Sequence, residues 1–360
     1  MKKSVASALT AAVVLGVAST SFATPTDEEV AELRARIAEL ERIIQEQNNA
    51  KASNGDVKKL DSRISELEDK SNKPTLLDKF NITGELRYRY WNLRKSPDYS
   101  RLELRLFPTF TIDEHFAVKS RVTGQYNNFH DDTASAWAMN FAYLEAKYNK
   151  FQLNVGKLPF FTNVDQGLVV DDFYSGVQAI MGDKTKVQIN AGHWNPSHAG
   201  IGKYNYVGAE VSGKFNDNLN AGIGYHYLKE GGTKNKESVI AGGVGYKFND
   251  DFGIFGAVAH NTEADEDKTA YNVEVNYKGA NRNEKSSWGA YAAYRYVPST
   301  VGFAPTYDTF SRIAGKKGFE IGATWTPYKN TLTKIAYFHG KRFVSDTNDR
   351  TFFARASVFF

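Results

Sequence analysis

The chain of 360 residues contains no cysteine, which excludes a disulfide framework, a thiolate nucleophile and a cysteine-based zinc site. Beyond the first 23 residues no run of 18 apolar residues occurs, so no membrane-spanning helix is predicted. The net charge is only +4, which gives no support for nucleic acid as a partner. No HExxH or GxSxG motif is present. We therefore expect a protein that is not an enzyme and that holds neither a metal nor a cofactor.

The N-terminus does contain one short apolar run. Lys2 and Lys3 precede it, and Ser21–Phe22–Ala23 places small residues at the two positions that matter for cleavage. This pattern predicts a secretory signal peptide over residues 1–23 and a mature chain that starts near Thr24. An uncleaved anchor helix is the alternative, but the run is short for a membrane span.

Residues 24–74 differ in character from the rest of the chain. Apolar residues follow a 3, 4, 3, 4 spacing with charged residues between them, first at Val30, Leu33, Ile37, Leu40 and Ile44, then at Val57, Leu60, Ile64 and Leu67. The spacing predicts a coiled-coil stalk in the periplasm, which Pro74 ends. A single amphipathic helix is the alternative. Valine or isoleucine at a and leucine at d favour a dimer.

From Phe80 the apolar period changes to two, which indicates β-strands. Sixteen strands are predicted, near 80–92, 99–112, 115–127, 137–148, 151–157, 174–182, 185–194, 204–215, 218–229, 237–248, 251–262, 269–279, 286–297, 317–326, 330–343 and 349–360. Links after even strands are mostly tight, whereas those after odd strands are longer, notably 158–173 and 298–316. This parity is typical of a transmembrane barrel. The predicted fold is all-β: a sixteen-stranded antiparallel β-barrel over residues 75–360 with a short N-terminal α-helical coiled coil.

The chain ends in "TFFARASVFF", with no polar tail. In a closed barrel the last strand pairs with the first, because no backbone edge can face lipid. Alternation places Phe352, Val358 and Phe360 on the lipid face and Arg355 on the opposite face. The terminal Phe360 resembles the signal that the barrel assembly machinery reads in outer-membrane proteins.

Charged residues alternate with apolar ones along the first three strands. An arginine or lysine on the lipid face costs roughly 2–4 kcal/mol at the midplane, so these side chains are expected to face the lumen. We call this set the basic wall; with Arg355 from the last strand it comprises Arg87, Arg89, Arg101, Arg105, Lys119, Arg121 and Arg355. Glu85 and Glu103 are the acidic residues among them. A merely solvated wall is the alternative interpretation.

The link after the fifth strand carries Asp165, Asp171 and Asp172 among apolar residues that a free surface loop would not need. From about residue 78 onward the chain resembles the sixteen-stranded general porins of bacterial outer membranes. In that family the third external loop, between strands 5 and 6, folds into the pore and faces basic residues of the early strands. The resemblance implies that these three aspartates form a constriction loop opposite the basic wall. The stalk resembles that of porins with an N-terminal coiled coil.

The resemblance also implies a function and partners. We expect a channel in the cell outer membrane for passive diffusion of ions and small hydrophilic solutes. The family is trimeric, so a homotrimer is expected despite the dimer-like heptads. Outer-membrane lipid, the assembly machinery and, through the stalk, peptidoglycan or another cell-wall polymer are the expected partners. A tethering protein with a structural barrel and a barrel enzyme remain alternatives, and ion preference remains open.

Overall fold

The structure is a computed structural model. It describes residues 35–36, 38–40, 42, 59–60, 62–65, 78–93, 98–127, 136–196, 203–311 and 314–360. The chain divides into two units, Met1–Pro74 and Thr75–Phe360. The described residues of the first unit are all helical. All of the predicted signal peptide, residues 1–23, and the rest of the predicted stalk lie outside the described residues, so both stay predictions. Among the described residues, no helix has the length and apolar character needed to cross a membrane.

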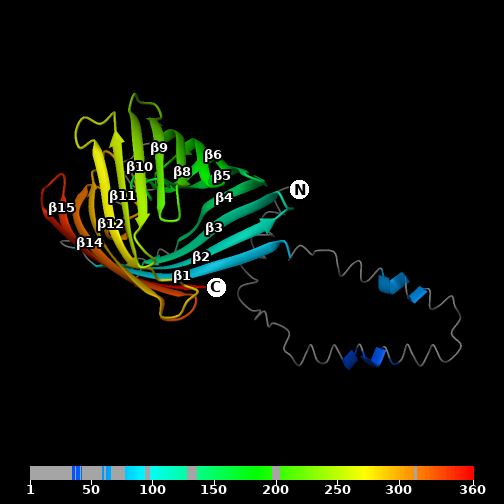
Figure 1. Ribbon diagram of the computed structural model, residues 1–360. Coiled ribbons are helices and arrows are strands. Elements are labelled where there is room, and N and C mark those ends of the chain that lie inside the picture. The colour runs from blue at the N-terminus through cyan, green and yellow to red at the C-terminus, as the bar shows by residue number, and fades with distance from the viewer. Residues whose placement is uncertain are drawn as a thin grey trace. The chain divides into compact units, whose positions relative to one another are not determined.

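The second unit is a closed antiparallel barrel of sixteen strands (Figure 1). The strands are β1 (Phe80–Leu93), β2 (Tyr99–Thr111), β3 (Phe116–Asn127), β4 (Ala136–Tyr148), β5 (Phe151–Phe161), β6 (Asp171–Gly182), β7 (Thr185–Trp194), β8 (Tyr204–Lys214), β9 (Leu219–Glu230), β10 (Lys236–Lys247), β11 (Phe252–Asn261), β12 (Thr269–Lys278), β13 (Trp288–Val297), β14 (Lys316–Trp325), β15 (Thr331–Arg342) and β16 (Asn348–Phe359). The predicted barrel is confirmed. Its strand boundaries agree closely except at β5 and β6.

β5 runs to Phe161 and β6 starts at Asp171, so the link between them is shorter than predicted. Pairing of β4 with β5 ends at Ala142 and Lys157, and pairing of β6 with β7 ends at Tyr174. Residues 158–173 therefore pair within their own hairpin but not with the barrel strands on either side. Proline is tolerated on such an edge, which explains why Pro159 does not end the strand. We call residues 158–173 the hairpin tip.

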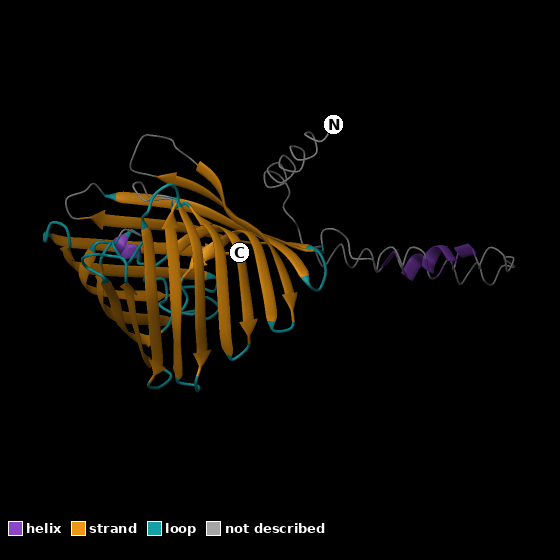
Figure 2. Cartoon of the chain, turned by 90° about the horizontal axis from the view of Figure 1, so that it is seen from above, coloured by secondary structure: helices purple, strands orange, loops and turns teal. Residues whose placement is uncertain are grey.

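The hairpin tip departs from the wall at Gly156. Its φ is +139°, and a Cβ there would lie 2.5 Å from the carbonyl oxygen of Ala142. Only glycine combines this backbone conformation with so close an approach to the neighbouring strand. The tip turns into the lumen, where loops lie inside the ring of strands (Figure 2).

Two loops meet inside the barrel. We call residues 162–170 the β5–β6 loop and residues 298–315, of which 312 and 313 are not described, the β13–β14 loop. Backbone hydrogen bonds join them: Phe303 N and Ala304 N donate to Val169 O at 3.0 and 3.1 Å, and Thr306 N donates to Gly167 O at 2.9 Å. Their apolar residues share one buried cluster with inward residues of the wall. One side of the lumen is thus filled with side chains.

The C-terminal seam closes through Phe360. Gly84 N donates to Phe360 O at 2.7 Å, and Phe360 N donates to Gly84 O at 3.1 Å. The aromatic ring lies over Gly84, where a Cβ would be 2.2 Å from a ring carbon. The last residue of the chain is therefore hydrogen-bonded into the barrel, and its neighbours alternate between buried Phe353 and exposed Phe352.

Candidate functional site

The lumen retains a cavity of about 1140 Å³ beside the two loops. Among the described residues, nine lysine and arginine side chains and six aspartate and glutamate side chains line it. The cations come chiefly from β1, β2, β3, β15 and β16, whereas several acids come from the hairpin tip and the β13–β14 loop. The cavity is therefore charged on all sides but divided in sign.

Most of the basic wall lines this cavity. Arg87, Arg89, Arg101, Arg105, Arg121 and Arg355 do so, as does Glu103. Within the described residues Lys119 is not part of the lining; its Nζ lies 2.8 Å from a carboxylate oxygen of Glu145 on β4. Glu85 is buried beside the cavity.

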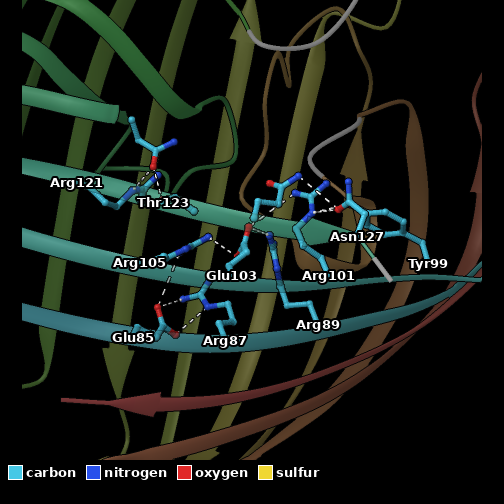
Figure 3. Close-up of polar contacts among 12 residues, drawn as sticks. Glu85, Arg87, Arg89, Tyr99, Arg101, Glu103, Arg105, Arg121, Thr123 and Asn127 are labelled. Carbon is cyan, nitrogen blue, oxygen red and sulfur yellow. Dashed lines mark hydrogen bonds and ion pairs between the residues drawn. The ribbon is translucent and has the colours of Figure 1, made fainter. Parts of the chain in front are cut away.

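The wall acids hold the arginines in place (Figure 3). Nε and Nη2 of Arg87 both donate to Glu85 at 2.8 Å. Glu103 accepts from Nη2 of Arg89 at 2.5 Å and from Nη2 of Arg105 at 3.0 Å. Each carboxylate thus orients guanidinium groups whose planar forks keep a fixed direction.

Four cationic residues lie directly opposite one another on adjacent strands of the barrel. The strand register pairs Lys334 with Arg355, Arg355 with Arg89, and Arg89 with Arg101. We call these four residues the cationic row. Like charges directly opposite one another destabilise a sheet, so the row needs negative charge from elsewhere. Sequence reasoning missed Lys334, although alternation in "TLTKIAYF" places it on the same face as buried Ala336 and Phe338.

Asp165 lies in the β5–β6 loop but does not line the cavity. Its side chain is buried within the loop, where Thr162 Oγ1 donates to it at 2.6 Å and Leu168 N at 2.9 Å. Burial, with a smaller contribution from nearby Glu210, raises the pKa of Asp165 to about 7. The structure places the Asp165 side chain inside the loop rather than in the cavity lining, where its hydrogen bonds join residues of the same loop.

Asp171 and Asp172 line the cavity, but they are the first residues of β6 rather than part of the loop. Asp171 accepts a hydrogen bond from Thr306 Oγ1 at 2.9 Å. Asp172 accepts one from Trp194 Nε1 at 3.0 Å. The two neighbours contact different elements because side chains alternate along a strand.

The β13–β14 loop supplies an acid that sequence reasoning missed, Asp308, in the short 3₁₀ helix η1 (Asp308–Phe310). Trp91 Nε1 donates to the backbone oxygen of Asp308 at 2.9 Å. The carboxylate accepts from Lys334 Nζ at 2.9 Å and lies 3.7 Å from Nη1 of Arg355. Burial alone would raise the pKa of Asp308, but these two cations hold it below its usual range. In the sequence, only the length of the link at residues 298–316 indicated that this loop could reach into the lumen.

A buried ion pair fixes the same loop from the other side. Nη2 of Arg295 lies 3.1 Å from Glu320 and 2.9 Å from Glu274. Its guanidinium carbon lies 3.9 Å from the ring centroid of Tyr307, and Thr309 donates to Glu320. The β13–β14 loop thus contacts Arg295 of β13 and Glu320 of β14, while Asp308 reaches β15 and β16. Among the described residues, no cluster of three or more metal-ligating side chains occurs.

The barrel is similar in structure to solved porin structures. Mutant forms of Rhodopseudomonas blastica porin match with TM-scores of 0.55 and 0.54 at 13% and 12% identity, over 78% of this chain and all of theirs. A chain described as "Asymmetric conductivity of engineered proteins" matches at 0.56 with 13% identity and the same coverage. The sequence matches no family model and no curated protein. The likeness shows that the barrel has the porin fold.

Proposed function

We propose that the barrel is an outer-membrane porin, a water-filled channel through which ions and small hydrophilic solutes diffuse passively. The observation that carries this proposal is the charged cavity of about 1140 Å³ inside a closed barrel. Sixteen strands enclose more space than the wall side chains fill. Large apolar residues such as Leu86, Val244 and Ile321 are exposed on the strands, as a lipid-facing surface requires.

The proposed constriction has two sides. The basic wall forms one, and the hairpin tip with the β13–β14 loop forms the other. Fixed charges in a narrow passage act more strongly on an ion than they do in bulk water, because less solvent screens them. The lining charge therefore sets ion preference, and the remaining cross-section sets the size limit.

Reconstitution of the purified, folded protein into planar bilayers tests the function. We expect stepwise conductance increments from the folded barrel and none from the same sample after heat unfolding. A folded, inserted barrel that passes no current in potassium chloride would refute the channel. If the barrel were instead an enzyme, the folded protein would convert a substrate but carry no ionic current across the bilayer.

We propose that the protein forms a homotrimer. Pairing of β4 with β5 stops at Ala142, so the β4 edge over Ala136–Phe141 has no strand partner on that side among the described residues. Trp137 and Met139 on this segment are 64% and 59% exposed. An unpaired strand edge is costly in lipid, and a second copy of the chain would cover it. Native mass measurement in detergent tests this; a dimer would favour the heptad prediction instead.

Assembly and tethering are separate proposals. Removal of Phe360 takes away the residue that pairs with Gly84, so we expect less inserted barrel and more protein in the periplasm. Equal insertion of the truncated and intact chains would argue against a terminal signal.

The proposed contact of the stalk, residues 24–74, with peptidoglycan is tested by co-sedimentation of the full chain with purified cell wall.

A further inference from the structure

The cationic row carries two carboxylates that come from different parts of the molecule. Glu103 on β2 contacts the first half of the row, at 2.5 Å from Arg89 and 3.8 Å from Arg101. Asp308 contacts the second half, at Lys334 and Arg355. Glu103 belongs to the wall itself. Asp308 is carried into the lumen by a loop, so half of the row is neutralised by an element outside the wall.

The row keeps donors that these carboxylates do not use. A guanidinium has five N–H groups, and a lysine ammonium has three. Among the described residues, Nε of Arg89 and Nε of Arg355 are buried without a hydrogen-bond partner. Both residues line the cavity, as do Lys334 and Arg101. These two Nε atoms are closed off, so a further oxygen ligand that enters the cavity would instead meet the guanidinium and ammonium ends of the row, whose N–H groups outnumber the bonds that the two carboxylates make.

We propose that the cationic row binds small carboxylate anions in transit and that Asp308 competes with them for Lys334 and Arg355. The inference rests on the proposed channel function. The ligand chemistry follows from the two carboxylates that already sit on the row, because arginine forks match the geometry of a carboxylate. Asp308 keeps the site weak, so that an anion held there also leaves.

Chloride current through reconstituted full-length protein, with succinate added at constant ionic strength, tests the site. Asp308→Asn keeps the size of the side chain and removes its charge. We expect the succinate concentration that blocks half of the current to fall about tenfold, since hydrogen bonds to charged groups are strong. Asp346→Asn is the matched control: Asp346 also lies 2.9 Å from a lysine, Lys341, but it is exposed and outside the cavity lining.

Lys334→Gln provides a second variant that leaves Asp308 in place. We expect it to raise the half-blocking concentration, because the row loses a cation. The inference is overturned if succinate blocks the natural protein and Asp308→Asn alike, or if it blocks neither. Should Asp308→Asn form no channels, an unchanged half-blocking concentration in Lys334→Gln overturns it alone. A natural protein that passes no current at all in potassium chloride refutes the channel function itself, which is a different result.

Discussion

The β5–β6 loop and the β13–β14 loop occupy the same lumen and share one buried apolar cluster, but the second also places Asp308 on the cationic row. Leu168 and Val169 of the first loop are fully buried. Val164 packs against Gly222 of β9, where an added Cβ would lie only 2.7 Å from the Val164 side chain. The second loop also buries Val301 and Phe310 completely, and in addition its Asp308 pairs with Lys334. Both loops fill space, but the second also brings a carboxylate to the cations of the wall.

This difference shows that inward folding and pore chemistry are separate properties of a loop. Apolar content is enough to bring a loop into the barrel, because burial of its side chains is favourable. The proposed charge selectivity also requires an acid at a particular place opposite the basic wall. The β5–β6 loop meets the first requirement, while its own acid, Asp165, is buried within it. Asp308 meets the second.

The largest effect is expected from removal of apolar packing. Leu168→Ala empties a fully buried position, and such changes cost about 2–5 kcal/mol. We expect the β5–β6 loop to undock and the single-channel conductance to rise, with little change in reversal potential. Val344→Ala, at a position that is 97% exposed, is the control. Unchanged conductance in Leu168→Ala would mean that the packing of Leu168 is not needed to keep the β5–β6 loop in the lumen.

The wall itself should give the next largest effect. Arg101→Gln with Arg105→Gln removes two lining cations and keeps hydrogen-bonding side chains. We expect the reversal potential in a salt gradient to move towards cation preference, most clearly in dilute salt, because the Debye length is about 30 Å at 0.01 M and about 3 Å at 1 M. Lys150→Gln, an exposed residue of the β4–β5 turn paired with Asp183, is the control. No shift would show that the wall is merely solvated.

The sequence predicted the barrel because strand alternation and turn chemistry are local properties. Alternation also placed Arg87, Arg89 and Arg101 on one face. The sequence predicted a long link at residues 158–173 but not that its two sides remain paired as a hairpin, because that pairing away from the neighbouring strands depends on the assembled barrel. It did not predict Asp308 for the same reason: its partners, Lys334 and Arg355, meet it only when the barrel closes.

A smaller effect, dependent on pH, should separate the loops further. The pKa of Asp165 is about 7 in the docked loop, against an ordinary value of 3.8. The docked loop holds the proton more tightly, so docking is most favourable below pH 3.8, weakens as pH rises, and is weakest above about pH 7. Hydrogen exchange of the Leu168 amide, corrected for intrinsic rate, should reveal this opening. Asp165→Asn should give a flat profile; a slope that survives in this variant would assign the titration to another group.

The smallest effect is expected where the two loops meet. Val170 and Ala304 form a parallel bridge, and strand spacing of about 4.8 Å falls within the Cα separation of about 4.4–6.8 Å that a disulfide spans. The chain has no cysteine, so Val170→Cys with Ala304→Cys creates a single possible bond. Because backbone hydrogen bonds already join the loops, oxidation should leave conductance and reversal potential unchanged. The reduced double variant is the control. A change in conductance that reverses on reduction would show that the two loops separate while the channel conducts.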